Sequence, residues 1–335
     1  MNPISSIIRQ ATKKTDEPYI VLTAPTHEAY ETNLCKSNAI FYALNHKGFK
    51  TWNPKYRPLP ANYIPVDSIP DGIQFDLVLS QNKFGQYQVL SDIARALHLP
   101  LISLEHTLPV PMWGRDIREG CVNMRGDINV FISEYSINEW QFNNFDPTVR
   151  VVKHGIDTEQ FKPDESKKRK PYIFSCVNDW VNRDWCCGFT IWQKIINGKN
   201  TLPTFVLGDT PGLSRPASST EELINEYQTS AVFLNTSTIS PVPTVLLEAM
   251  ACGTPVVTTA TCMIPEIIEH GVNGLMSNDI NELRSYCELI LSDEDLAKRL
   301  GENARKTIVE KFNANRFAED WNKLFLEASE VIYRG

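Results

Sequence analysis

Short apolar runs alternate with segments of helical periodicity along the whole chain, and this alternation is the feature that most constrains its fold. Such alternation is typical of βα units, which build parallel sheets covered by helices. The pattern runs twice, once on each side of a polar stretch at residues 157–170. We therefore predict an α/β protein of two Rossmann-like, doubly wound domains that face a cleft, with ligands at the carboxyl ends of the strands.

The first round of the pattern predicts an N-terminal domain over residues 19–156, preceded by a polar leader, residues 1–18. Its predicted strands are Tyr19–Thr23, Leu77–Leu79, Leu101–Leu104, Asn129–Ser133 and Val149–Lys153. Its predicted helices are a segment with Ile40, Phe41 and Leu44 that stops at Gly48, a second over Val89–Leu97, and a third that begins at Ser133 and reaches Trp140.

The second round predicts a C-terminal domain over residues 171–314 and a last helix over 315–335. The predicted strands are Tyr172–Cys176, Phe205–Leu207, Ala231–Leu234 and Pro255–Thr259. The predicted helices include Thr220–Thr229, Thr244–Ala251 and one from Ser292 to Phe312. The last predicted helix has five apolar residues on one face: Phe317, Trp321, Leu324, Phe325 and Ala328. The stretch 157–170 is interpreted as a linker, and its basic run 167–170 as solvated rather than as a patch for nucleic acid or membrane.

Composition and charge exclude several classes of protein. The chain of 335 residues has a net charge of -7, which disfavours a broad electrostatic contact with nucleic acid. No apolar run approaches the roughly 20 residues of a membrane span, and the first residues lack the apolar core of an export signal. We therefore expect a cytoplasmic protein with reduced cysteines, and not a periplasmic-type binding protein. No G-x-G-x-x-G follows a strand, which disfavours a dinucleotide oxidoreductase.

The segment Ser230–Met276 carries the most chemical information, because it predicts strand, loop, helix, tight turn and strand in close succession. Pro241 and Pro243 stiffen the loop before a helix that begins at Thr244. The backbone N–H groups of the first helical residues have no acceptor within the helix and suit a diphosphate; these residues are Thr244, Val245 and Leu246.

One acidic side chain follows this helix start at the spacing of one turn. Glu248 lies on the same face as Thr244, and its carboxylate can accept two hydroxyl protons of a ribose. Gly253 then permits the tight turn into the next strand. From the residues alone, a nucleotide site and an ordinary Rossmann-like helix with a surface glutamate remain equally open.

The chain resembles glycosyltransferase family 4 over nearly its whole length. The string LLEAMACGTPVV, Leu246–Val257, is similar to the donor-site helix and strand of that family, and Pro265-Glu266 and residues 271–275 are similar to its next loop. VVKHGIDTEQFKP, residues 151–163, resembles its interdomain segment, with His154 in place of the usual Asn. The resemblance implies a GT-B fold whose C-terminal helix crosses back to the first domain, and a retaining, hexosyltransferase-like enzyme that uses a UDP- or GDP-linked sugar without a bound metal or cofactor.

The resemblance also implies site residues, with departures in the donor domain. Members of the family carry two Glu residues that are separated by seven other residues. Glu248 matches the second Glu, which implies a ribose contact, whereas Ser240 stands at the position of the first. Serine can bind a sugar hydroxyl but supplies no carboxylate. Pro241-Val242-Pro243 replaces the usual G-F-G. These departures place the donor-sugar contacts in question, while the nucleotide contacts are less affected.

Further candidate residues lie at the ends of two predicted strands. Arg183 falls near a lysine position of the family that neutralises the diphosphate, and Asn178 near an arginine position, although an Arg183 paired with Asp179 or Asp184 is an equally open interpretation. His106 follows a buried strand and resembles the family's strand-end histidine, which faces the sugar. The roles of Thr26, His27 and Asn33 are not assigned.

The predicted function is transfer of a sugar from a nucleoside-diphosphate sugar to the hydroxyl of a glycan, a lipid-linked acceptor or a small molecule. His106, Ser240 and Arg183 are the predicted catalytic residues, and Glu248, Thr244, Val245, Arg183, Asn178 and Val242 are the predicted donor-binding residues. Two alternatives stay open: a nucleotide-sugar-binding protein with altered or lost catalysis, and an enzyme that modifies DNA bases. No stable nucleic-acid partner is expected, and a peripheral membrane contact is left open.

Overall fold

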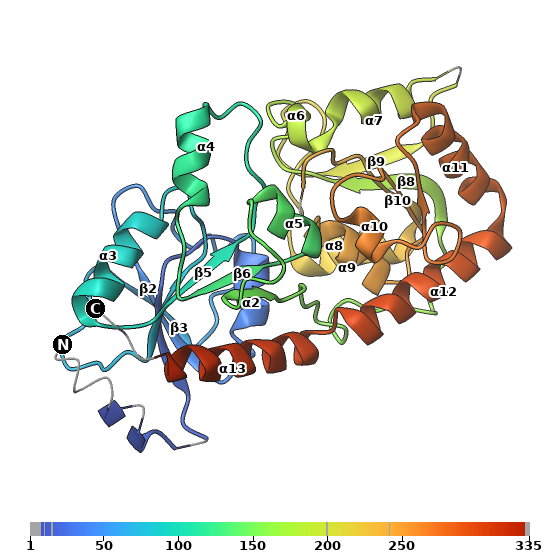
Figure 1. Cartoon of the computed structure of the whole chain (residues 1–335). Coiled ribbons are helices and arrows are strands. Elements are labelled where there is room, and N and C mark those ends of the chain that lie inside the picture. The colour runs from blue at the N-terminus through green and yellow to red at the C-terminus, as the bar shows by residue number, and fades with distance from the viewer. Residues whose placement is uncertain (1–7, 10, 15, 199, 241, 332–335) are drawn as a thin grey trace. The chain divides into compact units, whose positions relative to one another are not determined.

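A computed structural model of the chain divides into two compact units (Figure 1). Unit 1 comprises Met1–Gly155 and Ala314–Gly335, and unit 2 comprises Ile156–Asn313. The structure describes residues 8–9, 11–14, 16–198, 200–240 and 242–331. Both units are α/β structures built on parallel sheets, which confirms the predicted fold class.

Unit 1 is built on a seven-stranded parallel sheet with the order β3-β2-β1-β4-β5-β6-β7. The strands are β1 (Tyr19–Thr23), β2 (Ala39–Leu44), β3 (Tyr63–Val66), β4 (Leu77–Ser80), β5 (Leu101–Glu105), β6 (Ile128–Phe131) and β7 (Val149–Val151). The helices are α2 (Glu28–Leu34), α3 (Tyr87–Leu97), α4 (Arg115–Val122), α5 (Glu134–Glu139) and α13 (Ala314–Glu330).

Helices α3 and α13 pack on opposite faces of the unit 1 sheet. Leu22 and Val78 lie in the apolar cluster that α3 completes. Phe41, which pairs in register with Val21 and so points to the other face, packs edge-to-face with Phe325 of α13. The apolar stripe predicted for the last helix is confirmed, because all five of its side chains are buried: Phe317, Trp321, Leu324, Phe325 and Ala328.

The helix predicted around Ile40, Phe41 and Leu44 is wrong, because this segment forms strand β2. Its spacing fits one face of a helix, but Ala39, Phe41 and Ala43 are the fully buried side chains, which is the period-two pattern of a strand. The strand lies between β1 and β3, and short apolar runs of this kind are ambiguous until their pairing partners are known.

The polar leader makes specific contacts with unit 1. The carboxylate of Asp76, just before β4, is buried and accepts hydrogen bonds from the side chains of Arg9 and Lys13 and from the backbone N–H of Ile20. A buried carboxylate needs such partners, so the described part of the leader contributes to the stability of β1 and β4.

Unit 2 is built on a five-stranded parallel sheet with the order β12-β11-β10-β8-β9. The strands are β8 (Lys170–Cys176), β9 (Thr204–Leu207), β10 (Ser230–Asn235), β11 (Val256–Thr258) and β12 (Leu275–Met276). The helices are α6 (Asp184–Cys187), α7 (Phe189–Ile196), α8 (Thr220–Thr229), α9 (Thr244–Ala251), α10 (Ile264–Ile267), α11 (Ile280–Ser292) and α12 (Glu294–Lys311). Helices α8 and α9 have the predicted bounds.

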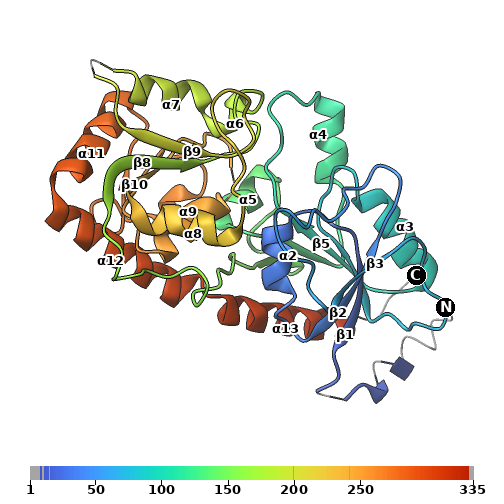
Figure 2. The ribbon, with the colours of Figure 1, turned by 180° about the vertical axis from the view of Figure 1, so that it is seen from behind.

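The two faces of the unit 2 sheet are covered by different helices. Helices α7 and α11 share an apolar cluster with alternate residues of the strands, among them Ile173 and Val232. On the other face, the rings of Phe174 and Phe233 pack edge-to-face with Tyr227 of α8, and α8 lies beside α9 (Figure 2). The face of α8 and α9 is the one that carries Glu248.

The turn after α9 takes the backbone conformation predicted for Gly253, which has φ +68°. A Cβ at Gly301 of α12 would lie 2.2 Å from the carbonyl oxygen of Gly253, so the helix packs against this turn without any side chain between them. The close approach fixes the end of α9 and therefore its direction in the unit.

The basic run 167–170 is held by the ends of two helices. The guanidinium of Arg169 donates to the carbonyl oxygens of Tyr227 in the last turn of α8 and Ser230 just after it, and of Cys252 and Gly253 after α9. The ammonium of Lys167 donates to side chains of α8. Cations at helix carboxyl ends satisfy carbonyl groups that lack intrahelical donors, so Arg169 has a structural role that the linker interpretation did not include.

None of the helices in the described ranges is long and apolar enough to cross a membrane.

Candidate functional site

The entry to α9 presents two backbone amides that have no acceptor among the described residues. The helix begins at Thr244, as predicted, and its N-cap is Pro243, which supplies no side-chain acceptor. The N–H of Leu246 donates to the carbonyl oxygen of Pro243 at 3.0 Å, so the prediction was wrong for this residue. The N–H groups of Thr244 and Val245 have no acceptor among the residues that the structure describes. Two amides at the positive end of the helix dipole can hold an anion.

Glu248 is buried one turn further along α9. Its residue surface is 3% exposed, and the hydroxyl of Tyr227 in α8 donates to its Oε2 at 3.1 Å. Burial, followed by the charge of Glu248, holds the pKa of Tyr227 well above its usual value, so the phenol keeps the proton that it donates. A carboxylate can accept several hydrogen bonds, so Glu248 can bind a ligand hydroxyl in addition to its protein partners.

Arg183 makes no ion pair with its acidic neighbours. Asp184 accepts from the backbone N–H and hydroxyl of Thr190, and Asp179 accepts from the side chain of Asn182. Within the described ranges, no carboxylate lies within ion-pair distance of Arg183, whose side chain is exposed at the start of α6. The alternative in which a neighbouring Asp occupies this guanidinium is therefore wrong, and the charge stays available to a ligand.

Hydrogen bonds connect the segment that follows Arg183 to the loop that precedes Ser240. The N–H groups of Thr238 and Ile239 donate to the carbonyl oxygen of Cys186 in α6, at 2.9 and 3.2 Å. The structure thus couples two segments that are more than fifty residues apart in the sequence. Ser240, which follows at once, is half-buried.

A glycine allows this contact between α6 and the loop. Gly188 has φ +65°, and a Cβ at this position would lie 2.0 Å from the carbonyl oxygen of Thr236. The hydroxyl of Thr236 in turn donates to the carbonyl oxygen of Gly188 at 2.9 Å. Only glycine fits here, so the sequence at Gly188 fixes the position of α6 relative to the loop.

The remaining predicted donor residues differ in exposure. Asn178 is exposed, and its carbonyl oxygen accepts from Nη1 of Arg183 at 3.4 Å. Val242 is buried, which leaves only its backbone for a ligand contact, and Val245 is half-buried. Pro241 lies outside the described residues. All of the predicted donor residues belong to unit 2, whereas His106 belongs to unit 1.

His106 lies at the carboxyl end of β5 with a defined tautomer. Its Nε2 is 3.3 Å from Oε1 of Gln81, and the amide nitrogen of Gln81 donates to the carbonyl oxygen of Ala24 and to Glu31. Oε1 is therefore an acceptor, His106 carries its proton on Nε2, and Nδ1 keeps a lone pair. Burial holds the pKa of His106 well below its usual value, so the ring is neutral.

Two further histidines, not assigned from the sequence, surround the same tyrosine. The ring of Tyr30 lies edge-on to His106 and His154, with centroid distances of 4.4 and 5.0 Å, and His27 stacks on His106 at 6.3 Å. Burial is the main cause that lowers the pKa of His154 to about 3. Nε2 of His154 is buried and has no hydrogen-bond partner in the described part of the chain.

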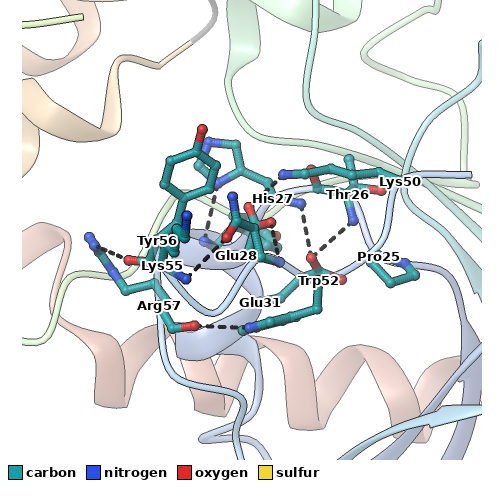
Figure 3. A network of polar contacts seen from close by, with 12 residues as sticks. Pro25, Thr26, His27, Glu28, Glu31, Lys50, Trp52, Lys55, Tyr56 and Arg57 are labelled. Carbon is teal, nitrogen blue, oxygen red and sulfur yellow. Dashed lines mark hydrogen bonds and ion pairs between the residues drawn. The ribbon is translucent and has the colours of Figure 1, made fainter. Parts of the chain in front are cut away.

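Helix α2, which positions His27 and Tyr30, was not predicted from the sequence. Its N-cap is His27, whose Nδ1 accepts from the N–H of Tyr30, and imidazole is not among the common capping side chains. The buried carboxylate of Glu31 accepts from the N–H groups of Thr26 and His27 and fixes the loop after β1 (Figure 3). The apolar Tyr30 and Leu34, four residues apart, were the signal that could have revealed the helix.

Two other features of the structure lie apart from these residues. A hollow of about 400 Å³ in unit 2 includes none of the predicted site residues; it is lined by Trp192, Thr204, Phe205, Val206, Gly212, Leu213, Ser214 and Arg215. Among the described residues, no group of three or more His, Cys, Asp or Glu side chains is placed to hold a metal ion.

Comparison with known proteins gives a family match to the segment of unit 2 that contains α9. Residues 216–307, which include α9 and Glu248, match the family described as Glycosyl transferases group 1. The N-acetyl-alpha-D-glucosaminyl L-malate synthase of Bacillus anthracis is 34% identical over 85 residues, which are 25% of this chain and 22% of that protein. The matched stretch thus spans less than a quarter of the length of this relative.

Solved structures match over almost the whole chain. HepE of Anabaena, solved in complex with UDP, has a TM-score of 0.73 at 15% identity and covers 92% of this chain and 100% of its own. The sucrose-phosphate synthase of Thermosynechococcus elongatus has a TM-score of 0.70 at 14% identity, covering 92% and 98%. The chain therefore has the GT-B glycosyltransferase fold, and residues 216–307 of its second unit match the glycosyl transferases group 1 family, in line with the resemblance to glycosyltransferase family 4.

Proposed function

We propose that the chain is a glycosyltransferase that moves a sugar from a nucleoside-diphosphate sugar to an acceptor hydroxyl. The observation that supports this most directly is the entry to α9, where the amides of Thr244 and Val245, without an acceptor in the described part of the chain, lie one turn before the buried carboxylate of Glu248. A diphosphate fits the amides, and a ribose hydroxyl fits the carboxylate. UDP is the proposed nucleotide because HepE was solved with UDP and with UDP-glucose.

In the proposed reaction, the bond between the anomeric carbon and the diphosphate breaks, and a bond to the acceptor oxygen forms with retention of configuration. The hydroxyl proton of the acceptor passes to the diphosphate oxygen that takes the electron pair of the broken bond, and the nucleoside diphosphate leaves. The exposed guanidinium of Arg183 and the two α9 amides offset the charge of the leaving group, so no metal is needed. His106, through the lone pair on Nδ1, and Ser240 orient sugar hydroxyls. The protein acts in the cytoplasm.

A thermal-shift screen against UDP, GDP, ADP and their sugars tests the donor assignment. UDP at about 100 times its dissociation constant should add roughly 2.7 kcal/mol to the free energy of unfolding, and GDP and ADP less. The anomeric configuration of the product, read by NMR couplings, tests retention. Stabilisation by none of the three nucleotides would remove the proposal.

A second function, nucleotide-sugar binding without transfer, rests on Ser240 in place of the acid that family members carry. The variant Ser240→Glu distinguishes the two. If the wild-type protein binds UDP-glucose but neither transfers nor hydrolyses it, and Ser240→Glu gains hydrolysis, the chain is a binding protein that lost this acid. Turnover by the wild-type protein excludes this alternative.

A further inference from the structure

Two adjacent thiols lie in contact in the one-turn helix α6 of unit 2 (Figure 1). The Sγ atoms of Cys186 and Cys187 are 3.6 Å apart, although successive residues of a helix ordinarily do not face each other. Both residues belong to the apolar cluster that α7 and α11 share. Two thiols at this distance become a disulfide by loss of their protons and of one electron each.

The cysteine pair lies directly beneath the surface of unit 2. Val181 and Trp185, which precede the pair, are 52% and 40% exposed, and Arg183 between them is exposed as well. A helix of a single turn has few hydrogen bonds of its own, so it opens locally at low cost. A small oxidant such as hydrogen peroxide can therefore reach the sulfur atoms when α6 opens.

Cys186 is the more acidic of the two thiols. The contact with the Cys187 thiol lowers the pKa of Cys186 against the opposing effect of burial, and the positive charge of Arg183 lowers it further. The same contact raises the pKa of Cys187. Because the thiolate is the form that reacts with peroxides, Cys186 attacks first and Cys187 is its resolving partner.

The carbonyl group of Cys186 connects the cysteine pair to the proposed donor site. Its oxygen accepts from the N–H groups of Thr238 and Ile239 at 2.9 and 3.2 Å, and Ser240 follows at once. A disulfide between adjacent residues closes a small ring that contains this carbonyl carbon. Because a disulfide needs its two Cβ atoms about 3.5 to 4.5 Å apart and adjacent helical residues do not face each other, ring closure changes the backbone of α6. The carbonyl group then turns away from the loop.

We propose that Cys186 and Cys187 are a redox-modification site, at which hydrogen peroxide forms a vicinal disulfide that weakens donor binding. In the first step, the Cys186 thiolate takes an OH group of the peroxide as the O–O bond breaks, and the hydroxide that leaves takes up a proton to form water. In the second step, the sulfur of Cys187 attacks the sulfenic acid of Cys186, the S–S bond forms, and the hydroxyl group leaves with the Cys187 proton as a second water. The two sulfur atoms lose the electron pair that the peroxide gains. The loss of donor affinity rests on the proposed function, whereas the disulfide itself does not.

Mass spectrometry of the full chain tests the disulfide. After treatment with hydrogen peroxide, free thiols are blocked with iodoacetamide, and trypsin, which cuts after Arg183 and Lys194, releases both cysteines in one peptide. We expect this peptide to lack two hydrogens and to carry no label, and to carry two labels when dithiothreitol precedes the blocking step. Two labels after peroxide alone, or a cross-link to Cys262, whose thiol contacts the carbonyl oxygen of Thr238, would overturn the site.

Calorimetry and hydrogen exchange connect the modification to the donor site. UDP should bind the oxidised protein at least about tenfold more weakly than the reduced protein, and dithiothreitol should restore the affinity. The amides of Thr238 and Ile239 should exchange at least about tenfold faster in the oxidised protein, because the Cys186 carbonyl no longer accepts from them. Equal UDP affinity of the reduced and oxidised proteins, with the disulfide present by mass, would overturn the proposal.

Variants locate the effect of peroxide. Cys186→Ala and Cys187→Ala each remove one sulfur atom of the pair, so peroxide should change the UDP affinity of either variant by less than about twofold. Cys287→Ala is the matched control, since Cys287 is a buried cysteine of α11 in the same apolar cluster, and this variant should respond to peroxide as the wild-type protein does. An equal response of all three variants would overturn the site.

The same samples separate this proposal from the proposed function. Absence of UDP binding to the reduced wild-type protein removes the proposed function, while the mass of the tryptic peptide still decides whether the disulfide forms. Binding of UDP that peroxide does not change leaves the donor assignment in place and removes the redox control.

Discussion

The hydroxyl of Tyr227 and the carboxylate of Glu248 form a buried hydrogen bond of 3.1 Å between α8 and α9. The donor has its pKa raised and stays protonated, so the contact fixes one oxygen of the carboxylate. An acid held in this way needs no rearrangement before it binds ribose, which is the form of preorganisation that binding sites use.

Tyr227→Phe should loosen this carboxylate. Removal of the hydroxyl leaves a buried charge with one hydrogen bond fewer, which costs about 1 to 3 kcal/mol of stability. UDP should also bind more weakly, because the carboxylate is no longer oriented. Thermal unfolding with and without UDP measures both effects.

Tyr172→Phe is the matched control for that variant. The hydroxyl of Tyr172 donates to Glu226 of α8 at 2.7 Å, so the same atom is removed from the same unit, but from a half-buried contact away from α9. If the two substitutions change UDP affinity equally, the Tyr227 contact has no specific role in binding.

Arg169→Met should destabilise unit 2. Four carbonyl oxygens at the ends of α8 and α9 lose a charged donor, although water can replace it at this partly exposed position, so we expect a loss of about 2 kcal/mol. Chemical denaturation measures the change. Lys168→Met removes the neighbouring exposed charge and should change stability by less than about 0.5 kcal/mol; a similar loss in both variants would contradict the structural role of Arg169.

His154→Asn should make the protein more resistant to acid. The folded-state pKa of His154 is about 3, below the unfolded value, so its contribution to stability is complete above about pH 6.5 and is lost as the pH falls toward 3. Asn does not titrate. Between pH 6.5 and 4 the wild-type protein should lose roughly 2 to 3 kcal/mol more than the variant.

Denaturation curves at both pH values measure this difference. His98→Asn is a suitable control, because His98 follows α3 with φ +53°, a conformation that Asn tolerates, and is only half-buried. Parallel pH profiles for the wild-type protein and His154→Asn would show that the buried ring does not couple to folding.

Removal of divalent metal should leave the donor site intact. If Arg183 and the amides of Thr244 and Val245 offset the diphosphate charge, EDTA should change UDP affinity and transfer rate by less than about twofold. Loss of UDP binding in EDTA, restored by Mg²⁺ or Mn²⁺, would show that a metal carries part of this charge.

The sequence predicted most of unit 2 because its signals are local. Helix α8 has Ser219 as N-cap and acids in its first turn, and α9 is a mostly apolar segment that starts after a proline. Both have the predicted bounds. In unit 1, β2 was mistaken for a helix because the identity of a short apolar run depends on β1 and β3, which are its partners only in the fold.

The candidate site was predictable where it lies within one segment. The start of α9 and the spacing to Glu248 could be read directly, whereas the bond from Thr238 to Cys186 joins distant segments and left no sequence signal. In unit 1, the contacts of Glu28 in α2 with Lys50 and Asn53 of the loop between β2 and β3 also join distant segments, and they left no sequence signal. Whether Arg183 forms an ion pair likewise depends on which residues Asp179 and Asp184 bind in the fold, and the sequence does not give these partners.

The central claim, that Glu248 binds the nucleotide, is tested most directly by calorimetric titration of UDP into the wild-type protein and Glu248→Gln. The amide keeps the size of the side chain and can still accept from Tyr227, but it removes the charge that a ribose hydroxyl would meet. We predict that UDP binds the variant at least about tenfold more weakly, the factor that corresponds to about 1.4 kcal/mol. Equal affinity of the two proteins for UDP would contradict the assignment.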